Sequence, residues 1–323
     1  MNKVTVSAPG KLMLFGEHAV VYNHPCLVTA VDQRMRATVS LLENNEFQLE
    51  ASDVQVSNYS KPLSELGKEE IPKGAQFVEI AIKNFAEKYK IQQGIRVETS
   101  SEFSSKFGFG SSSASTVCTI KALSELSGKK LNNKEIFDLS YKTVLDIQGK
   151  GSGFDVAAAV YGGVLYFVTG GKIIEPLTID NLPLIVGYSG VKADTVTLIN
   201  KVKETFADKQ SELSEIYNST EKIVEEARPA VVSSNWKKVG GLMNESQKLL
   251  VKLGVSIEKL DNMILGAVNA GAYGAKLSGA GGGDCMIALA PEGKRKAVEN
   301  AIEKAGGEIL SVETNAKGAE VEG

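Results

Sequence analysis

The chain has 323 residues, of which 43% are hydrophobic and 23% are charged, and its formal net charge is -3. This composition is ordinary for a soluble globular protein, and the length suggests two domains. The balanced charge gives no sign of a nucleic-acid partner, and no apolar run approaches the ~18 residues that indicate a membrane span.

The cysteines and histidines limit the metal and disulfide chemistry that is available. Cys26, Cys118 and Cys285 are far apart and form no CxxC pair, which favours a reducing cytosol over a disulfide framework or a zinc site. With His18 and His24 as its two histidines, the chain is poorly equipped for a multi-histidine metal site. The N-terminus turns polar and glycine-rich too early for a signal peptide, so we expect a cytoplasmic protein.

The first half of the chain alternates predicted strands and helices. Apolar and polar residues alternate over 3–8, which predicts a strand that Pro9-Gly10 breaks. The patterns that follow predict a strand over 28–41, a helix over 75–90, a strand over 95–99, a helix from 114 to about Gly128, a helix over 133–147 and a strand over 164–168.

The second half begins with a predicted strand over 182–189 and then changes character. Long amphipathic helices are expected from about residue 193, and strands near 274–278, 284–290 and 308–313 close the chain. We therefore place a domain boundary near residue 180, with domains over 1–180 and 181–323.

The stretch FGFGSSSAS, residues 107–115, lies between a predicted strand and a predicted helix. Gly108 and Gly110 allow backbone N–H groups to approach an anion at the positive end of the helix. Ser111, Ser112 and Ser113 could cap the helix, donate to phosphate oxygens or ligate a metal ion. Taken alone, the stretch fits a tight turn with a serine cap equally well.

Two further segments favour a binding role. SAPGKLMLFGEHAV, residues 7–20, places Lys11 after the Pro-Gly pair and ahead of Glu17 and His18. AKLSGAGGGDCMIAL, residues 275–289, has five small residues, 279–283, between apolar runs. A tight turn needs two or three such residues, so five suggest that the backbone passes close to something bulky and polar.

In order, these three segments resemble the three motifs of the GHMP small-molecule kinases. The resemblance implies an α+β fold of two domains, an N-terminal domain like ribosomal protein S5 domain 2 and a C-terminal ferredoxin-like domain, with the active site between them. It also implies that FGFGSSSAS wraps the phosphates of ATP and that Ser112 ligates Mg²⁺. A homodimer is compatible with the family.

The same resemblance assigns the site residues. Asp155, in GKGSGFDVAAAVYGG over 149–163, matches the catalytic aspartate, and Lys11 matches its lysine partner. By itself Asp155 would read as a helix-capping carboxylate. The residues implied for the nucleotide are Lys106, Gly108, Gly110, Ser111, Ser112 and Ser113, and those implied for the substrate are Glu17, His18, Gly279, Ala280 and Gly281.

The acceptor is the point on which the motifs disagree. GEHAVVY and the C-terminal half resemble mevalonate kinases, which implies phosphorylation of mevalonate by ATP. GSGFDVAAAVYG, Lys106 and GYSGVKADT resemble phosphomevalonate kinases, whose acceptor is 5-phosphomevalonate. Where mevalonate kinases bring a helix glutamate to the magnesium, this chain has Val144, with Asp146 the adjacent carboxylate. We predict a mevalonate kinase; a phosphomevalonate kinase and a non-catalytic regulator on the same fold are the alternatives.

Overall fold

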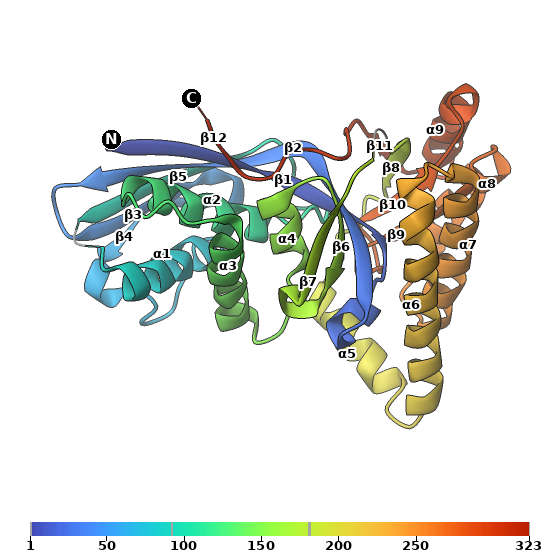
Figure 1. The fold of residues 1–323 in the computed structure, drawn as a ribbon, viewed down its shortest axis with the longest axis horizontal. Helices are drawn as coiled ribbons and strands as arrows, with labels where there is room; N and C mark the ends of the chain where they lie inside the picture. The colour runs from blue at the N-terminus through green and yellow to red at the C-terminus, as the bar shows by residue number, and fades with distance from the viewer. Residues whose placement is uncertain (1, 92, 180–181, 323) are drawn as a thin grey trace.

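The computed structural model describes residues 2–91, 93–179 and 182–322. Over these residues the chain builds two sheets, each with its own helices, arranged end to end in an elongated molecule (Figure 1). The predicted mixed α+β character is confirmed. The boundary predicted at residue 180 lies outside the described residues and stays a prediction.

The first sheet contains eight of the strands in the described part of the chain. Its main path runs in the order β12-β1-β2-β5-β3-β4, and β6 pairs with β2 and with β7. The strands are β1 (Lys3–Phe15), β2 (Pro25–Leu42), β3 (Glu46–Ala51), β4 (Val56–Pro62), β5 (Gly94–Ser101), β6 (Val164–Val168), β7 (Ile173–Leu177) and β12 (Glu320–Glu322). All neighbours are antiparallel except β3 and β5, which are parallel.

Four helices cover this sheet: α1 (Gln76–Tyr89), α2 (Ser111–Leu126), α3 (Asn133–Gln148) and α4 (Phe154–Tyr161). The central helix α2 packs on β1 and β2 and contacts the other three helices. Its apolar residues at the predicted spacing, among them Val117, Ile120 and Leu123, are buried in the main core. This packing fixes the N-terminus of α2 beside the middle of β1.

Strand β1 does not stop at Pro9-Gly10, so the predicted break is wrong. The strand continues to Phe15, but its partner on β2 jumps from Arg34 opposite Pro9 to Val31 opposite Gly10. Proline has no N–H for the ladder, and a local irregularity accommodates it without ending the strand. Beyond this shift, the Lys11 N–H donates to the Phe109 carbonyl at 3.0 Å, which places Lys11 against the glycine-rich loop.

The second sheet has the order β11-β8-β10-β9. Its strands are β8 (Leu184–Tyr188), β9 (Gly274–Ser278), β10 (Cys285–Leu289) and β11 (Glu308–Leu310). The helices of this half are α5 (Thr195–Thr205), α6 (Gln210–Val232), α7 (Trp236–Lys252), α8 (Glu258–Asn269) and α9 (Arg295–Lys304). Helices α7 and α8 pack on β9 and β10, while α6 contacts both α7 and the first sheet.

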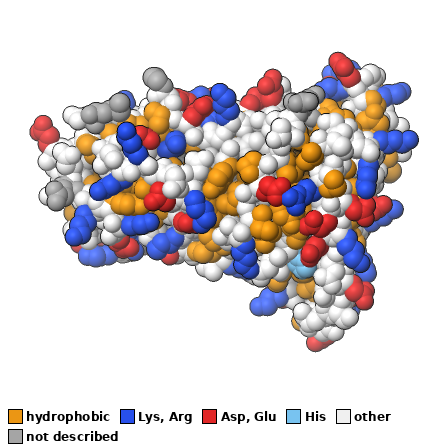
Figure 2. All heavy atoms as spheres, in the orientation of Figure 1, with side chains coloured by type: hydrophobic (Ala, Val, Ile, Leu, Met, Phe, Trp, Pro, Cys, Tyr) orange, Lys and Arg blue, Asp and Glu red, His pale blue; other side chains and the backbone are white. Residues whose placement is uncertain are grey.

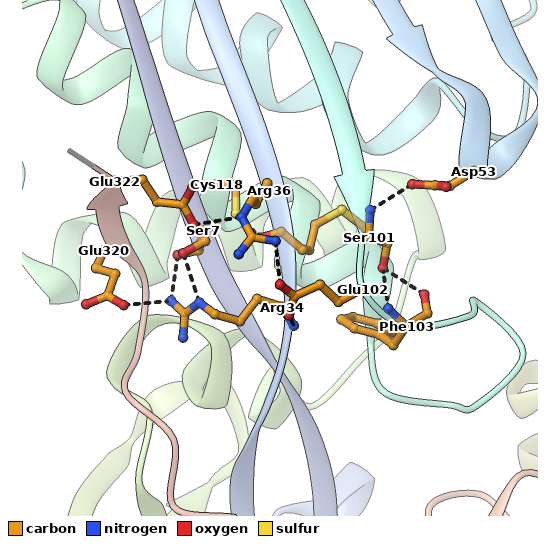
Figure 3. Close-up of polar contacts among 11 residues, drawn as sticks. Ser7, Arg34, Arg36, Asp53, Ser101, Glu102, Phe103, Cys118, Glu320 and Glu322 are labelled. Atoms are coloured by element: carbon orange, nitrogen blue, oxygen red, sulfur yellow. Dashed lines mark hydrogen bonds and ion pairs between the residues drawn. The ribbon is translucent and has the colours of Figure 1, made fainter. Parts of the chain in front are cut away.

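The end of the chain returns to the first sheet, and both termini lie at the same end of the molecule (Figure 1). Two arginines of β2 hold the returning segment (Figure 3). Arg34 donates to the Ser7 hydroxyl at 2.8 Å and to the Gly318 carbonyl at 2.9 Å. Arg36 donates to Glu322 at 2.8 Å, on the edge strand β12. The last residues thus tie the C-terminal half back to the N-terminal half.

Acidic and basic side chains are interspersed with small apolar areas on the face shown in Figure 2. Among the described helices, none combines the length and the apolar character needed to cross a membrane.

Candidate active site

A cavity of about 310 Å³ opens where the first sheet, the glycine-rich loops and the start of α5 meet. Residues from the three motif segments and from the Asp155 segment, 149–163, share its wall. The lining includes Lys11, Met13, Glu17, His18, Ser105, Gly108, Gly110, Ser111, Ser112, Val144, Lys150, Gly153, Phe154, Asp155, Lys192, Ala193, Thr195, Val196, Ile199, Gly279, Ala280 and Asp284. Chain segments separated by more than 250 residues therefore build one site.

Two helices begin at the cavity without a side-chain cap. The N-cap residues of α2 and α4 are Gly110 and Gly153, and neither N-cap residue caps its helix with a side-chain hydrogen bond. In contrast, α3 begins with a capping box between Asn132 and Glu135. The serines of the loop therefore do not cap α2. The first-turn N–H groups of α2 stay available to an anion, as a phosphate-binding site requires, whereas in α4 the Val156 N–H donates to Asp155.

Lys11 and Asp155 flank Gly110 inside the cavity. A Cβ added to Gly110 would lie 3.5 Å from Lys11 side-chain carbons and 3.6 Å from the Asp155 Cβ. The φ angle of Gly110 is +80°, in the left-handed region that favours glycine. Asp155 accepts hydrogen bonds from the Ser113 hydroxyl at 2.5 Å and from the Val156 N–H at 3.0 Å. The carboxylate is thus held in a fixed orientation beside the lysine.

Lys11 is buried and donates to the Gly108 carbonyl at 2.7 Å. Burial lowers the pKa of Lys11, and the nearby negative charges of Asp155 and Asp284 oppose this shift. The ammonium group also lies 5.4 Å from the centre of the Phe154 ring. Lys11 is therefore a buried lysine whose charge is supported by the nearby carboxylates of Asp155 and Asp284.

Glu17 and His18 form another part of the wall, and both are buried. The His18 Nε2–H donates to the Ala280 carbonyl at 2.8 Å, and Glu17 forms an ion pair with the buried Lys276. Burial lowers the pKa of His18, although the hydrogen bond to Ala280 and the charge of Glu17 oppose it. Because both contacts join the N-terminal half to the C-terminal half, we call this region the seam: Met13, Glu17 and His18 on one side and Lys276, Ser278 and Ala280 on the other.

The five small residues at 279–283 serve two purposes. Gly279 and Ala280, two of the residues implied for the substrate, line the cavity. Gly281 does not belong to the described lining, because it packs against the chain itself, where an added Cβ would overlap the Val255 carbonyl oxygen. Part of the glycine run is therefore explained by close packing within the protein.

The structure also places three other parts of the motifs differently from what the sequence implied. Ser113 lies behind the described lining and orients Asp155. Lys106 is exposed and lies outside the lining described for the cavity. Val144 lines the cavity, whereas Asp146 accepts hydrogen bonds from Lys142 at 2.5 Å and Asn84 at 2.9 Å. The cavity therefore gains no carboxylate from this part of α3.

Asp284 is a charged residue of the cavity that the motif analysis missed. Its carboxylate accepts a hydrogen bond from the Ala193 N–H at 2.9 Å and abuts Gly108. Burial raises the pKa of Asp284, and the Ala193 contact, Lys11 and Lys192 oppose the shift. The sequence did contain a signal for Asp284, because this aspartate stands between the end of a glycine run and the start of an apolar strand.

The rim of the cavity carries two lysines that were also missed. Lys192 precedes α5 and is exposed, and Lys150 donates to Asn200 of α5 at 2.8 Å across the rim. Both lie in polar loops whose lysines look like ordinary surface residues in the sequence.

Comparison with known proteins decides the family. The model of the GHMP kinases N terminal domain matches residues 76–163, and that of the GHMP kinases C terminal matches residues 227–308. A mevalonate kinase of Thermococcus sibiricus is 36% identical over 331 residues, covering 99% of this chain and 98% of that protein. The chain belongs to the mevalonate kinases of the GHMP kinase family. The resemblance inferred from the sequence motifs is thereby confirmed, and this GHMP kinase is an ATP-dependent small-molecule kinase.

Solved structures agree with this assignment. The mevalonate kinase of Methanococcus jannaschii is 29% identical and has a TM-score of 0.79, with 96% of this chain and 97% of that chain covered. The Lin0012 protein of Listeria innocua is 26% identical with a TM-score of 0.87, and 99% of each chain is covered. The two-domain GHMP kinase fold predicted from the motifs is confirmed.

Proposed function

We propose that this GHMP kinase transfers the γ-phosphoryl group of ATP to the 5-hydroxyl group of mevalonate, making 5-phosphomevalonate in the mevalonate pathway of isoprenoid synthesis. The observation that carries the proposal is the placement of Lys11 and Asp155 on either side of Gly110, in a cavity that also receives the uncapped start of α2. Phosphoryl transfer needs positioning, charge neutralisation and an acceptor for the hydroxyl proton, and these groups supply all three.

Each residue then has one chemical role. The Asp155 carboxylate accepts the proton of the attacking hydroxyl group, while the bond from that oxygen to the γ-phosphorus forms and the bond to the β-phosphate oxygen breaks. The Lys11 ammonium stabilises negative charge on the attacking oxygen. Ser113 holds Asp155 through its hydroxyl, and the backbone of residues 108–112 receives the phosphates.

The donor set fits a magnesium ion that is held largely by the nucleotide. Mg²⁺ usually keeps several waters and binds one or two protein groups together with phosphate oxygens. The Ser112 hydroxyl lies on the cavity wall and would hold the ion; Val144 has no oxygen to offer, and Asp146 is engaged elsewhere. When bound, the ion would neutralise charge on the phosphates.

Mevalonate is favoured over 5-phosphomevalonate by the charges that face the cavity. Lys106, which resembles the lysine that phosphomevalonate kinases carry before this loop, is exposed and lies outside the described lining. At the seam the acceptor meets the Glu17 carboxylate and a His18 imidazole whose pKa is lowered, which suit a hydroxyl group better than a dianion. Of the two lysines on the rim, Lys150 donates to Asn200 at 2.8 Å, and Lys192 offers a cation to the carboxylate of mevalonate.

The experiment is a coupled assay of ADP release by the purified protein with ATP-Mg²⁺ and either mevalonate or 5-phosphomevalonate, with products identified by mass. We expect mevalonate to be the better substrate by at least one order of magnitude in kcat/KM. A preference for 5-phosphomevalonate would establish the phosphomevalonate kinase alternative. Nucleotide binding with no turnover of either would establish the regulator. The cytosolic location and the homodimer stay predictions.

A further inference from the structure

Strand β9 presents different residues to the two halves of the molecule. Ala275 and Leu277 belong to the core under the C-terminal helices. Lys276 and Ser278 point the opposite way, because side chains alternate along a strand. The Ser278 hydroxyl donates to the Met13 carbonyl at 3.0 Å and accepts from the Met13 N–H at 3.0 Å. The polar face of β9 therefore forms its side of the seam.

Lys276 is fully buried, with 0% exposure. Its ammonium group donates to Glu17 Oε1 and, at 2.5 Å, to the Leu277 carbonyl. Burial lowers the pKa of Lys276, and the opposing charge comes from Glu17. A buried cation is costly unless it is paired, and Glu17 supplies the partner from the other side of the seam.

Glu17 uses one of its two carboxylate oxygens for Lys276. The other, Oε2, is buried and has no hydrogen-bond partner among the described residues. Glu17 nevertheless lines the cavity, and its exposure is 2%. Buried carboxylate oxygens almost always have a partner, so the geometry points to a donor group on the bound acceptor.

We propose that Lys276 is a positioning residue, which fixes Glu17 through Oε1 so that Oε2 accepts a hydrogen bond from the non-reacting hydroxyl group of the acceptor. This proposal rests on the proposed function, because mevalonate carries a tertiary hydroxyl at C3 besides the 5-hydroxyl that reacts. The free carboxylate oxygen at this point can accept a hydrogen bond from a hydroxyl group, whereas the acceptor's own ionised carboxylate has no proton to donate to it. The pair therefore also sets which way round the acceptor lies.

The test compares mevalonate with 5-hydroxy-3-methylpentanoate, which lacks the C3 hydroxyl. We expect the wild type to prefer mevalonate by roughly ten- to a hundred-fold in kcat/KM, the usual effect of losing one charge-assisted hydrogen bond. In Lys276→Met and Glu17→Gln the preference should fall to within about fivefold. The double variant should keep the same remaining preference for mevalonate as Glu17→Gln alone, because Lys276 acts through Glu17.

A matched control is Leu277→Val, on the same strand but facing the other core. It should lower the melting temperature and keep the preference for mevalonate, which separates positioning from general stability. Should Lys276→Met fail to fold, the polar variant Lys276→Gln replaces it. If a folded Lys276 variant still preferred mevalonate over the analogue as strongly as the wild type does, the positioning role would be overturned. If the wild-type protein did not phosphorylate mevalonate, the proposed function would be overturned instead.

Discussion

The two walls of the cavity are built in different ways. The transfer wall (Lys11, Gly108, Gly110 and Asp155, with Ser113 behind it) lies within the N-terminal half, where Lys11 donates to Gly108 and Asp155 accepts from Ser113 and Val156. The seam joins both halves through a buried ion pair and three hydrogen bonds to backbone atoms. From this difference we expect phosphoryl transfer to depend mainly on groups of the N-terminal half, and the choice of acceptor to depend on how the two halves meet.

The largest effect is expected at the transfer wall. Asp155→Asn keeps the shape of the side chain and removes its charge, so turnover should drop by roughly two to four orders of magnitude. ATP binding, measured by calorimetry, should change little. Asp146→Asn is the control, since that carboxylate binds Lys142 and Asn84 away from the cavity. Near-normal turnover of Asp155→Asn would remove Asp155 from the chemistry.

The phosphate loop should respond nearly as strongly. Gly110→Val puts a branched side chain at a φ of +80°, between Lys11 and Asp155, so ATP affinity should fall by at least about tenfold. Gly128→Val is the matched control, because Gly128 has a φ of +67° with nothing within 4 Å of an added Cβ. Both variants should keep the wild-type circular dichroism spectrum. Equal ATP affinity in the two would show that the loop is not at the nucleotide.

At the seam the expected effect is smaller and falls on the acceptor. His18→Ala removes an imidazole held by Ala280, and the KM for mevalonate should rise by about three- to tenfold with the KM for ATP unchanged. Lys106→Ala should alter the mevalonate KM by less than about twofold, since Lys106 is exposed. A large Lys106 effect confined to 5-phosphomevalonate would reverse the assignment of the acceptor.

The smallest effect concerns pH. Because burial lowers the pKa of Lys11, the ammonium loses its proton at a lower pH than an ordinary lysine. Turnover should therefore decline as the pH rises through this lowered pKa, and the decline should be absent in Lys11→Arg, whose guanidinium stays protonated. Rates across pH 7 to 10 check this, with stability monitored in parallel. The same alkaline decline in Lys11→Arg would assign it to another group.

Much of the fold could be predicted because its signals are local. The helical spacing over 75–90 and 133–147 corresponds to α1 and α3, and Gly149 ends α3 with a φ of +70° as expected. The strands β3 and β4 escaped prediction because their short alternation is mixed with exposed polar residues. Strand β12 has three residues and depends on Arg34 and Arg36, which lie far away in sequence.

In the site, too, residues with a local sequence signal could be predicted, and residues that depend on distant partners could not. Lys11, Gly110, Ser112 and Asp155 could be proposed from the sequence because they stand in segments that resemble the family's motifs, and the structure places all four on the cavity wall. Lys276 could not, because its partner Glu17 is 259 residues away and no local pattern links them. Contacts across a domain boundary leave no periodic trace in the sequence, so the seam required the structure.

The central claim is that the transfer wall performs the phosphoryl transfer and the seam selects the acceptor. The most direct measurement is the single-turnover rate of phosphoryl transfer by rapid quench, at saturating ATP-Mg²⁺ and mevalonate, for Asp155→Asn and Glu17→Gln. We predict that Asp155→Asn slows this step by roughly two to four orders of magnitude, whereas Glu17→Gln stays within about tenfold of the wild type once mevalonate is saturating. Equal slowing of the step in both variants would contradict the division between the two walls.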